Sequence, residues 1–528
     1  MGNMFEKMLH EDEDIDVKRE SKKEPSKKKE QIPWLSILAV IFLALIPRLL
    51  YIFYFSNPNF PGWYTDTFHH WQVAYLSKEV GFSQGFLRLW DFKGMEFFWG
   101  LLHPLALVIL FYITGSTHVL VPRLLSTFGG VISIVLIFLF IKRHFGKWVA
   151  WMVAILASFF PITLFSNTAG MQEELALPFM FGAMLLWPAQ PIIAGIFFAL
   201  ASMVRAEYWL FAAGLILSTV VLRRNLDKVV ILVGTYLVII VIYMKYIVNY
   251  TGNWIYPIYW NFLASVKGEW FEDLPVVGEK LLAKQISQGI FVFGLVGAIV
   301  TLIRRPKYAL FYLFGFGNIL FIGFMVGFGS YVKGYIPRFW VDRLYNWPYL
   351  FTGILIILLF FYYIPKYVKS FKMASMVFGG LLVGVGLLFS QFIWRPINFF
   401  MQPVEHIYNT EREWAEEIGR AYRGGGVLLP EDRPYITYFL VQDHGIEGKN
   451  MVGQMFDPFF YFEDKENPFG NWGEEREIVL NWLSENNIRL IALTLEKPTY
   501  LGLFEREPQY FNKLPSDKVL LYEVKDIN

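Results

Sequence analysis

The chain has 528 residues, of which 55% are hydrophobic, 19% aromatic and only 17% charged. A soluble globular protein needs far fewer apolar side chains. This composition therefore excludes a soluble globular protein and indicates a membrane protein. Cysteine is absent, which excludes disulfides and thiolate metal sites. The formal net charge is only +2, and no nucleic-acid partner is expected.

The first 33 residues are rich in charge, with an acidic cluster from Glu11 to Asp16 ahead of a basic run from Lys18 to Lys29. A segment with so few apolar residues does not bury a core, so we predict a disordered cytoplasmic tail over 1–33. A cleavable signal peptide has only a short basic region before its apolar core. Because the tail is long and the apolar run behind it extends from 34 to 55, we expect an uncleaved anchor.

Apolar runs of about 20 residues predict a transmembrane region over 34–394. Short cytoplasmic loops are enriched in Lys and Arg, so the basic tail places the N-terminus inside. The basic loops placed on the same side are 142–144, 223–224, 304–305 and 366–372. Two loops on the same side of the membrane are separated by an even number of spans, a condition called parity below. With this condition we predict eleven transmembrane helices, near 34–55, 119–141, 147–165, 174–187, 191–204, 206–222, 229–250, 287–303, 308–330, 348–364 and 373–394.

Three large outer loops result, at 56–118, 251–286 and 331–347. The apolar stretch 97–114 does not fit the parity as a crossing, so we predict that it lies on the outer membrane surface. After residue 394 the chain becomes polar, and 395–528 is predicted to be a small extracytoplasmic α/β domain.

Local patterns support this α/β domain. Thr410 and Glu413 have the spacing of a capping box at a helix start. The predicted strands are GVLLP at 426–430, RLIALT at 489–494 and KVLLYEV at 518–524, and the predicted amphipathic helix is EEREIVLNWLSENN at 474–487. The glycines at 424–426 precede a strand instead of opening a helix, which favours a turn over a phosphate-binding loop.

The stretch GWYTDTFHHW, at 62–71, follows the first predicted span. Its Asp66, His69 and His70 have the spacing i, i+3 and i+4, which places all three on one face of a helix. Such a face is typical of a helix at the membrane surface. It also fits a site in which Asp66 is a general base and the histidines contact substrate or a metal.

Further ionisable residues lie at the outer ends of predicted spans. Glu173 and Glu174 have no basic neighbour in sequence, and acids at that depth are costly unless they cap a helix N-terminus or serve a site. Arg205 and Glu207 fit either an ion pair that closes a turn or substrate contacts. Arg48, inside the first span, is predicted to snorkel outward or to pair with an acid.

The third outer loop, YVKGYIPRFWVDRLYNW at 331–347, combines aromatic residues with three cations, Lys333, Arg338 and Arg343. Cations at the outer interface suit a lipid phosphate. An aromatic belt with anchoring basic residues is the alternative interpretation.

Together these features resemble the GT-C superfamily of integral-membrane glycosyltransferases: an acid in a long first outer loop, a second acidic group at the next outer turn, a basic inner turn KRHFG at 142–146, an Arg-Ala-Glu hairpin at 205–207 and a C-terminal outer α/β domain. TDTFHHWQVAYLSKEVGF, at 65–82, resembles the first-loop motif of the dolichyl-phosphate-mannose-dependent mannosyltransferases and of the oligosaccharyltransferase catalytic subunits. The WWDYG signature of the latter is absent, since the nearest text, FGNWGEE at 469–475, lacks the double Trp and the following Asp.

The resemblance implies transfer of a sugar from a polyprenyl (dolichyl) phosphate in the outer leaflet to a glycan, lipid or protein acceptor. Asp66 would be the base that takes the acceptor's proton, while Glu173 or Glu174 would orient the acceptor or assist. One direct displacement would invert the anomeric configuration. Candidate substrate contacts are His69, His70, Arg205, Glu207, Lys333, Arg338 and Arg343, with the cations among them stabilising the departing phosphate.

A divalent cation, Mg²⁺ or Mn²⁺, held by Asp66, His69 and Glu174 is an alternative use of the same residues, although hard cations usually gather more oxygen ligands. A transporter or flippase of lipid-linked sugars would show the same spans and cations; inverted repeats or broken helices would favour it. A noncatalytic subunit that binds through the outer domain would tolerate loss of Asp66. An oligosaccharyltransferase-like enzyme is a further alternative function, besides the transporter or flippase and the noncatalytic subunit.

Overall fold

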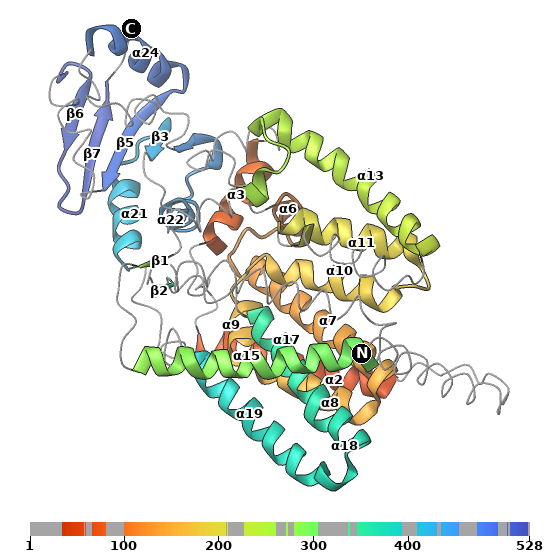
Figure 1. The fold of residues 1–528 in the computed structure, drawn as a ribbon. Coiled ribbons are helices and arrows are strands. Elements are labelled where there is room, and N and C mark those ends of the chain that lie inside the picture. The colour runs from red at the N-terminus through yellow and green to blue at the C-terminus, as the bar shows by residue number, and fades with distance from the viewer. Residues whose placement is uncertain are drawn as a thin grey trace.

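The structure is a computed structural model. It describes residues 34–56, 59, 66–80, 100–206, 208–209, 226–259, 271–272, 279–304, 336–337, 346–392, 409–429, 434–453, 472–494, 504 and 507–525. Helices between 34 and 392 form a helical body, and residues 409–525 form a smaller α/β unit at one end of it (Figure 1). Helix α3 (Asp66–Val80) lies between the two (Figure 1).

The helical body contains, besides α3, a series of helices that differ widely in length. In chain order they are α2 (Trp34–Leu50) with the π-helix η1 (Tyr51–Phe55), α6 (Leu102–Thr114), α7 (Leu120–Phe145), α8 (Lys147–Phe159), α9 (Pro161–Thr168), α10 (Glu173–Leu186), α11 (Pro191–Val204), α13 (Leu226–Thr251), α15 (Glu279–Arg304), α17 (Asn346–Ile357) with η6 (Leu358–Tyr363), α18 (Ile364–Tyr367), η7 (Lys369–Phe371) and α19 (Lys372–Phe392).

Among the described residues, four helices are long and apolar enough to cross a membrane: Trp34–Phe55, Leu120–Phe145, Leu226–Asn249 and Leu350–Tyr367. The pair Lys147–Phe159 and Pro161–Thr168 adds a fifth if it is one span, bent by 60°. The bend falls at Pro161, which has no backbone N–H to continue the helix, behind an extended Phe160. These helices make the chain a multi-pass membrane protein.

The predicted number of eleven spans is not confirmed. The helices at the predicted spans 174–187 and 191–204 have 14 residues each, or about 21 Å at 1.5 Å per residue, which is short for a hydrocarbon core of about 30 Å. The span predicted at 206–222 lies largely outside the described residues, and the one at 308–330 lies wholly outside them.

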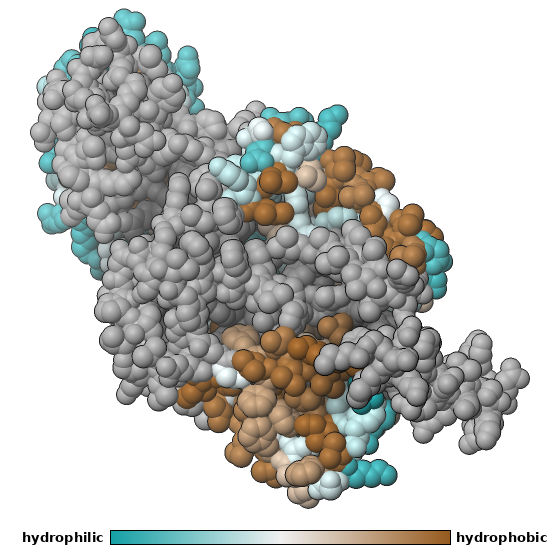
Figure 2. Space-filling model, viewed as in Figure 1, coloured by the Kyte–Doolittle hydropathy of each residue, from teal (hydrophilic) through white to brown (hydrophobic). Residues whose placement is uncertain are grey.

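Exposed apolar side chains cover much of the helical body. Figure 2 shows hydrophobic residues over α13 and over the region of α17 to α19, whereas hydrophilic residues border the α/β unit. The exposed apolar residues of α13 include Val230, Val238 and Ile242, each more than 60% exposed. So wide an apolar surface is unfavourable in water and suits contact with lipid tails.

Glycines bring α7 close to the end of α9 and the start of α10. A Cβ added at Gly129 would overlap the backbone of Glu174, and one added at Gly130 would overlap the side chain of Asn167. The absence of side chains at these two positions therefore lets the 166–174 segment lie directly on α7.

The α/β unit has a five-stranded mixed sheet with strand order β4-β3-β5-β7-β6. Strands β4 and β5 run parallel to β3, while β7 is antiparallel to β5 and to β6. The elements in chain order are α21 (Asn409–Ala421), β3 (Gly426–Leu429), α22 (Pro434–His444), η8 (Gly448–Asn450), β4 (Met451–Gly453), α24 (Trp472–Glu485), β5 (Ile488–Thr494), β6 (Phe511–Leu514) and β7 (Val519–Val524). Strands β3, β5 and β7 thus lie where strands are predicted at 426–430, 489–494 and 518–524, with residue 430 outside the described residues, and α24 lies two residues earlier than the helix predicted at 474–487.

Successive residues of the strands point to opposite faces of this sheet. Val427 and Leu490 pack in a cluster with Trp414 and Leu440, which places α21 and α22 on one face. Leu428, Ile491 and the α24 residues Val479 and Leu483 form a second cluster on the other face.

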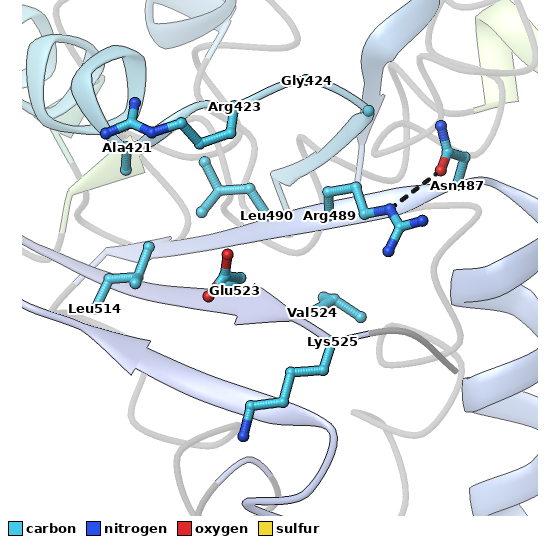
Figure 3. Close-up of a pocket in the computed structure, with 11 residues that line it drawn as sticks. Ala421, Arg423, Gly424, Asn487, Arg489, Leu490, Leu514, Glu523, Val524 and Lys525 are labelled. Atoms are coloured by element: carbon cyan, nitrogen blue, oxygen red, sulfur yellow. Dashed lines mark hydrogen bonds between the residues drawn. The ribbon is translucent and has the colours of Figure 1, made fainter. Parts of the chain in front are cut away.

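The predicted glycine turn is confirmed, with φ of 108° at Gly424 and 82° at Gly425, values that other residues rarely adopt. The turn lines an open pocket of about 550 Å³ in the α/β unit. Arg423, Arg489 and Lys525 are spread around Glu523 in this pocket (Figure 3).

Candidate active site

Helix α3 begins at Asp66 and contains His69 and His70, so the three residues lie on one helix, as their i, i+3, i+4 spacing requires for a shared face. A carboxylate in the first turn is favoured by the partial positive charge of the helix N-terminus. Asp66 is partly exposed, whereas His69 and His70 are buried, with 4% and 0% of their surface exposed. The ring of His70 lies 4.8 Å from that of His103 on α6, and burial lowers the pKa of His103 to about 3, so His103 is neutral at pH 7. A substrate role for His69 and His70 stays a prediction.

The first turn of α3 contacts the turn that precedes α10. The Thr67 hydroxyl donates to the Ala169 carbonyl at 2.5 Å, and a Cβ at Gly170 would lie 2.7 Å from Thr67 Cγ2. From the other side, the Ser126 hydroxyl of α7 donates to the Met171 carbonyl at 2.9 Å. The structure therefore brings the start of α3, with Asp66, against the turn that leads to Glu173 and Glu174.

The two glutamates have different surroundings. Glu174 is fully buried, and its Oε1 accepts a hydrogen bond from Ser166 at 2.6 Å. Glu173 keeps 15% side-chain exposure and forms an ion pair with Arg205, Nη1 to Oε1, at 3.3 Å. Glu173 is thus the less buried residue of the two, although both of its carboxylate oxygens are buried, and the cation that the neighbouring sequence does not supply comes from the end of α11.

Arg48 does not snorkel outward. It is fully buried within the first span, where Nε donates to Asn167 Oδ1 and Nη1 to the Ala44 carbonyl, both at 2.7 Å. Glu174 lies within electrostatic range of this guanidinium. Arg48 consequently joins α2 to the end of α9. It thereby lies next to the turn 169–172 that leads to Glu173 and Glu174, here called the acid turn.

Sequence reasoning missed Arg123, a fully buried cation in the first turn of α7. Its Nε donates to the Thr168 carbonyl and its Nη2 to Ser56 Oγ, both at 2.8 Å. An Arg inside the apolar VPRLL segment was the available signal, since a charge in such a run needs a partner or a function. Arg123 fixes the Thr168 carbonyl and adds a positive charge close to the acid turn.

Four predicted contacts, Glu207, Lys333, Arg338 and Arg343, lie outside the described residues. Within the third outer loop, 331–347, the structure describes residues 336–337 and 346–347. Ile336–Pro337 form strand β2, which pairs with β1 (Phe271–Glu272) of the second outer loop. In the part of the chain that the structure describes, no three His, Asp or Glu residues come close enough to hold a metal ion.

The fold defines a class, a multi-pass helical membrane protein with an α/β unit packed on the helix that carries Asp66. No family model matches the chain, and no curated protein matches it.

The solved structures similar to this chain include the following three. The first is the Archaeoglobus fulgidus oligosaccharyltransferase complex with zinc and sulfate, at 12% identity and a TM-score of 0.45, covering 92% of this chain and 72% of that one. The second is AglB from Archaeoglobus fulgidus with an inhibitory peptide and a dolichol-phosphate, at 12% identity and a TM-score of 0.43, covering 93% of this chain and 75% of that one. The third is ArnT from Cupriavidus metallidurans bound to undecaprenyl phosphate, at 11% identity and a TM-score of 0.45, covering 93% of this chain and 96% of that one.

Proposed function

We propose that this chain is a GT-C-type membrane glycosyltransferase that moves a sugar from a polyprenyl-phosphate donor to an acceptor on the outer face. One observation carries the proposal: Thr67 joins the first turn of α3, which begins with Asp66, to the turn that leads to Glu173. A partly exposed carboxylate thereby lies at the contact with the turn that leads to a second acid, which pairs with Arg205. This combination suits proton removal beside a bound anion.

In the proposed reaction, the acceptor hydroxyl oxygen attacks the anomeric carbon while the bond from that carbon to the phosphate oxygen breaks. Asp66 takes the hydroxyl proton, and both electrons of the broken bond leave with the polyprenyl phosphate. A single displacement of this kind inverts the anomeric configuration. Glu173 is the acid that orients the acceptor, because it pairs with Arg205 close to the surface of the helical body, whereas Glu174 is fully buried and bonded to Ser166.

A dolichyl-phosphate mannose donor and a protein acceptor are the finer form of this proposal. A role for Mg²⁺ or Mn²⁺ would require Asp66, His69 and Glu174 as the metal ligands. These residues do not fit such an ion in the described part of the chain, because no group of three acids or histidines is formed there. No step of the proposed reaction is therefore assigned to a metal.

The proposed function is tested by supplying the purified protein with a polyprenyl-phosphate hexose and measuring both released polyprenyl phosphate and glycosylated acceptor. Both products are expected from a glycosyltransferase. A transporter or flippase would instead move the lipid-linked sugar across a proteoliposome membrane and leave its glycosyl bond intact, which would overturn the proposal.

The cationic loop at 331–347 is expected to hold the lipid phosphate. Arg338→Gln and Arg343→Gln each remove a charge-assisted hydrogen bond worth roughly 1.5–3 kcal/mol, so donor affinity should fall about ten- to a hundredfold. Arg→Lys should restore only part of it, because guanidinium can bond two phosphate oxygens at once. Donor titration in one fixed detergent and salt measures this. Unchanged donor affinity in both Gln variants would remove the loop from the site.

The proposed membrane orientation rests on the basic tail and loops, which predict a cytoplasmic N-terminus and an α/β unit outside. Protease added outside intact cells is therefore expected to remove the chain after residue 394. Protection of the α/β unit together with cleavage of the tail would show that the orientation is inverted.

A further inference from the structure

The α/β unit packs directly on helix α3. The ring of Phe68 lies 5.1 Å from that of Tyr435 and 5.2 Å from that of Tyr438, and the ring of Trp71 lies 4.9 Å from that of Tyr438. All four side chains are at least nine-tenths buried, and they belong to one apolar cluster shared by α3, α6 and α22. Edge-to-face contacts of this kind specify orientation as well as burying area.

Hydrogen bonds extend this contact along the outer turns of α3. Gln72 Nε2 donates to Thr437 Oγ1 at 3.1 Å, and the Gly448 N–H of η8 donates to the Tyr75 hydroxyl at 3.2 Å. A Cβ at Gly448 would lie 2.8 Å from side-chain atoms of both Leu76 and Tyr75, so the backbone of η8 rests on α3, and a side chain at 448 would have to shift these two. Two elements of the α/β unit, α22 and η8, therefore hold α3.

Helix α22 also holds the start of α7. The Val119 N–H donates to the Tyr438 hydroxyl at 3.4 Å, and Gln442 Nε2 donates to Thr117 Oγ1 at 3.2 Å. Helix α3 also contacts the start of α7 directly, since Trp71 Nε1 donates to the Thr117 carbonyl at 2.5 Å. Helix α22 thus bridges the helix that begins with Asp66 and the helix on which the acid turn rests.

We propose that α22 is a positioning element of the active site, with Tyr438 as its main positioning residue. Docking of the α/β unit sets the distance between Asp66 on α3 and the acid turn supported by α7. This inference rests on the proposed function for the meaning of that distance, but the docking itself can be measured without substrate.

The chain contains no cysteine, which allows the docked state to be locked by one engineered disulfide. A Cβ at Gly448 would lie 3.4 Å from the Cβ of Glu79, close to the separation of about 3.5–4.5 Å found in disulfides. Glu79 is exposed at the far end of α3 from Asp66. The test uses E79C/G448C in the full chain, each single Cys variant, and Gly448→Ala as the control for crowding against Tyr75.

Oxidised E79C/G448C is expected to form the cross-link and to keep at least about half of the kcat of Gly448→Ala. Tyr438→Ala should lower kcat about ten- to a hundredfold with little change in donor KM, because a displaced base costs turnover more than donor binding. Adding the disulfide to Tyr438→Ala should restore most of the lost kcat. Tyr510→Ala, a Tyr of the same unit that contacts Arg476 instead of α3, is the matched control.

Amide hydrogen exchange over 66–80 gives a readout independent of activity. Exchange should rise in Tyr438→Ala and return to the wild-type level in the locked variant. The proposal is overturned if 79 and 448 do not cross-link, if the oxidised enzyme is inactive until reduced, or if Tyr438→Ala changes neither exchange nor kcat. Should the wild type transfer no sugar at all, the proposed function fails, while cross-linking and exchange still decide whether α22 positions α3.

Discussion

Asp66→Asn is expected to lower sugar transfer about 100- to 10,000-fold while leaving the fold and donor affinity intact. Asn keeps the size and much of the hydrogen bonding of Asp but cannot accept the acceptor's proton, and general base catalysis contributes about this much. Asp66 suits the role because it lies at the partly exposed start of α3, against the acid turn. Single-turnover transfer from a polyprenyl-phosphate hexose, with donor affinity measured in parallel, checks the prediction.

Glu79→Gln is the matched control, since it removes a carboxylate from the exposed far end of the same helix and should leave turnover unchanged. Glu173→Gln should have a smaller effect than Asp66→Asn if Glu173 orients the acceptor. Near-normal turnover in Asp66→Asn would contradict the assignment, and a large loss in Glu173→Gln at the same time would move the base to Glu173. Normal turnover in both variants would favour the transporter.

The second large effect is expected on stability. Arg48→Met removes a buried guanidinium that bonds Asn167 and the Ala44 carbonyl. The buried Glu174 nearby loses a compensating positive charge. Breaking a buried charge network from one side typically costs about 3–5 kcal/mol, so the free energy of unfolding should fall by about that amount. A denaturant titration in one fixed detergent measures it.

Arg143→Met is the control for this substitution, because Arg143 is an exposed arginine near the end of α7, and its replacement should change stability by no more than about 0.5 kcal/mol. The double variant Arg48→Met/Glu174→Gln should recover part of the loss, since it removes both buried charges together. Equal stability in Arg48→Met and Arg143→Met would show that the Arg48 network contributes nothing to the folded state.

Several features could be predicted from the sequence because they depend on neighbours in the chain. Asp66, His69 and His70 share a face of one helix because a helix repeats every 3.6 residues. The strands at 426–429, 488–494 and 519–524 follow from short apolar runs between polar turns. The apolar runs of the helical body likewise predict its helices, since each must satisfy its own backbone hydrogen bonds within a membrane.

Only the tertiary structure decided how these elements meet. The Glu173–Arg205 ion pair joins residues 32 positions apart, and the Arg48–Asn167 bond joins residues 119 apart. The Gln72–Thr437 bond that docks the α/β unit on α3 spans 365 positions. Sequence periodicity describes which face an element buries but carries no information on which distant element covers it. The surroundings of the acids therefore depend on packing between remote segments, whereas the shared helix face of Asp66, His69 and His70 follows from their spacing in the local sequence.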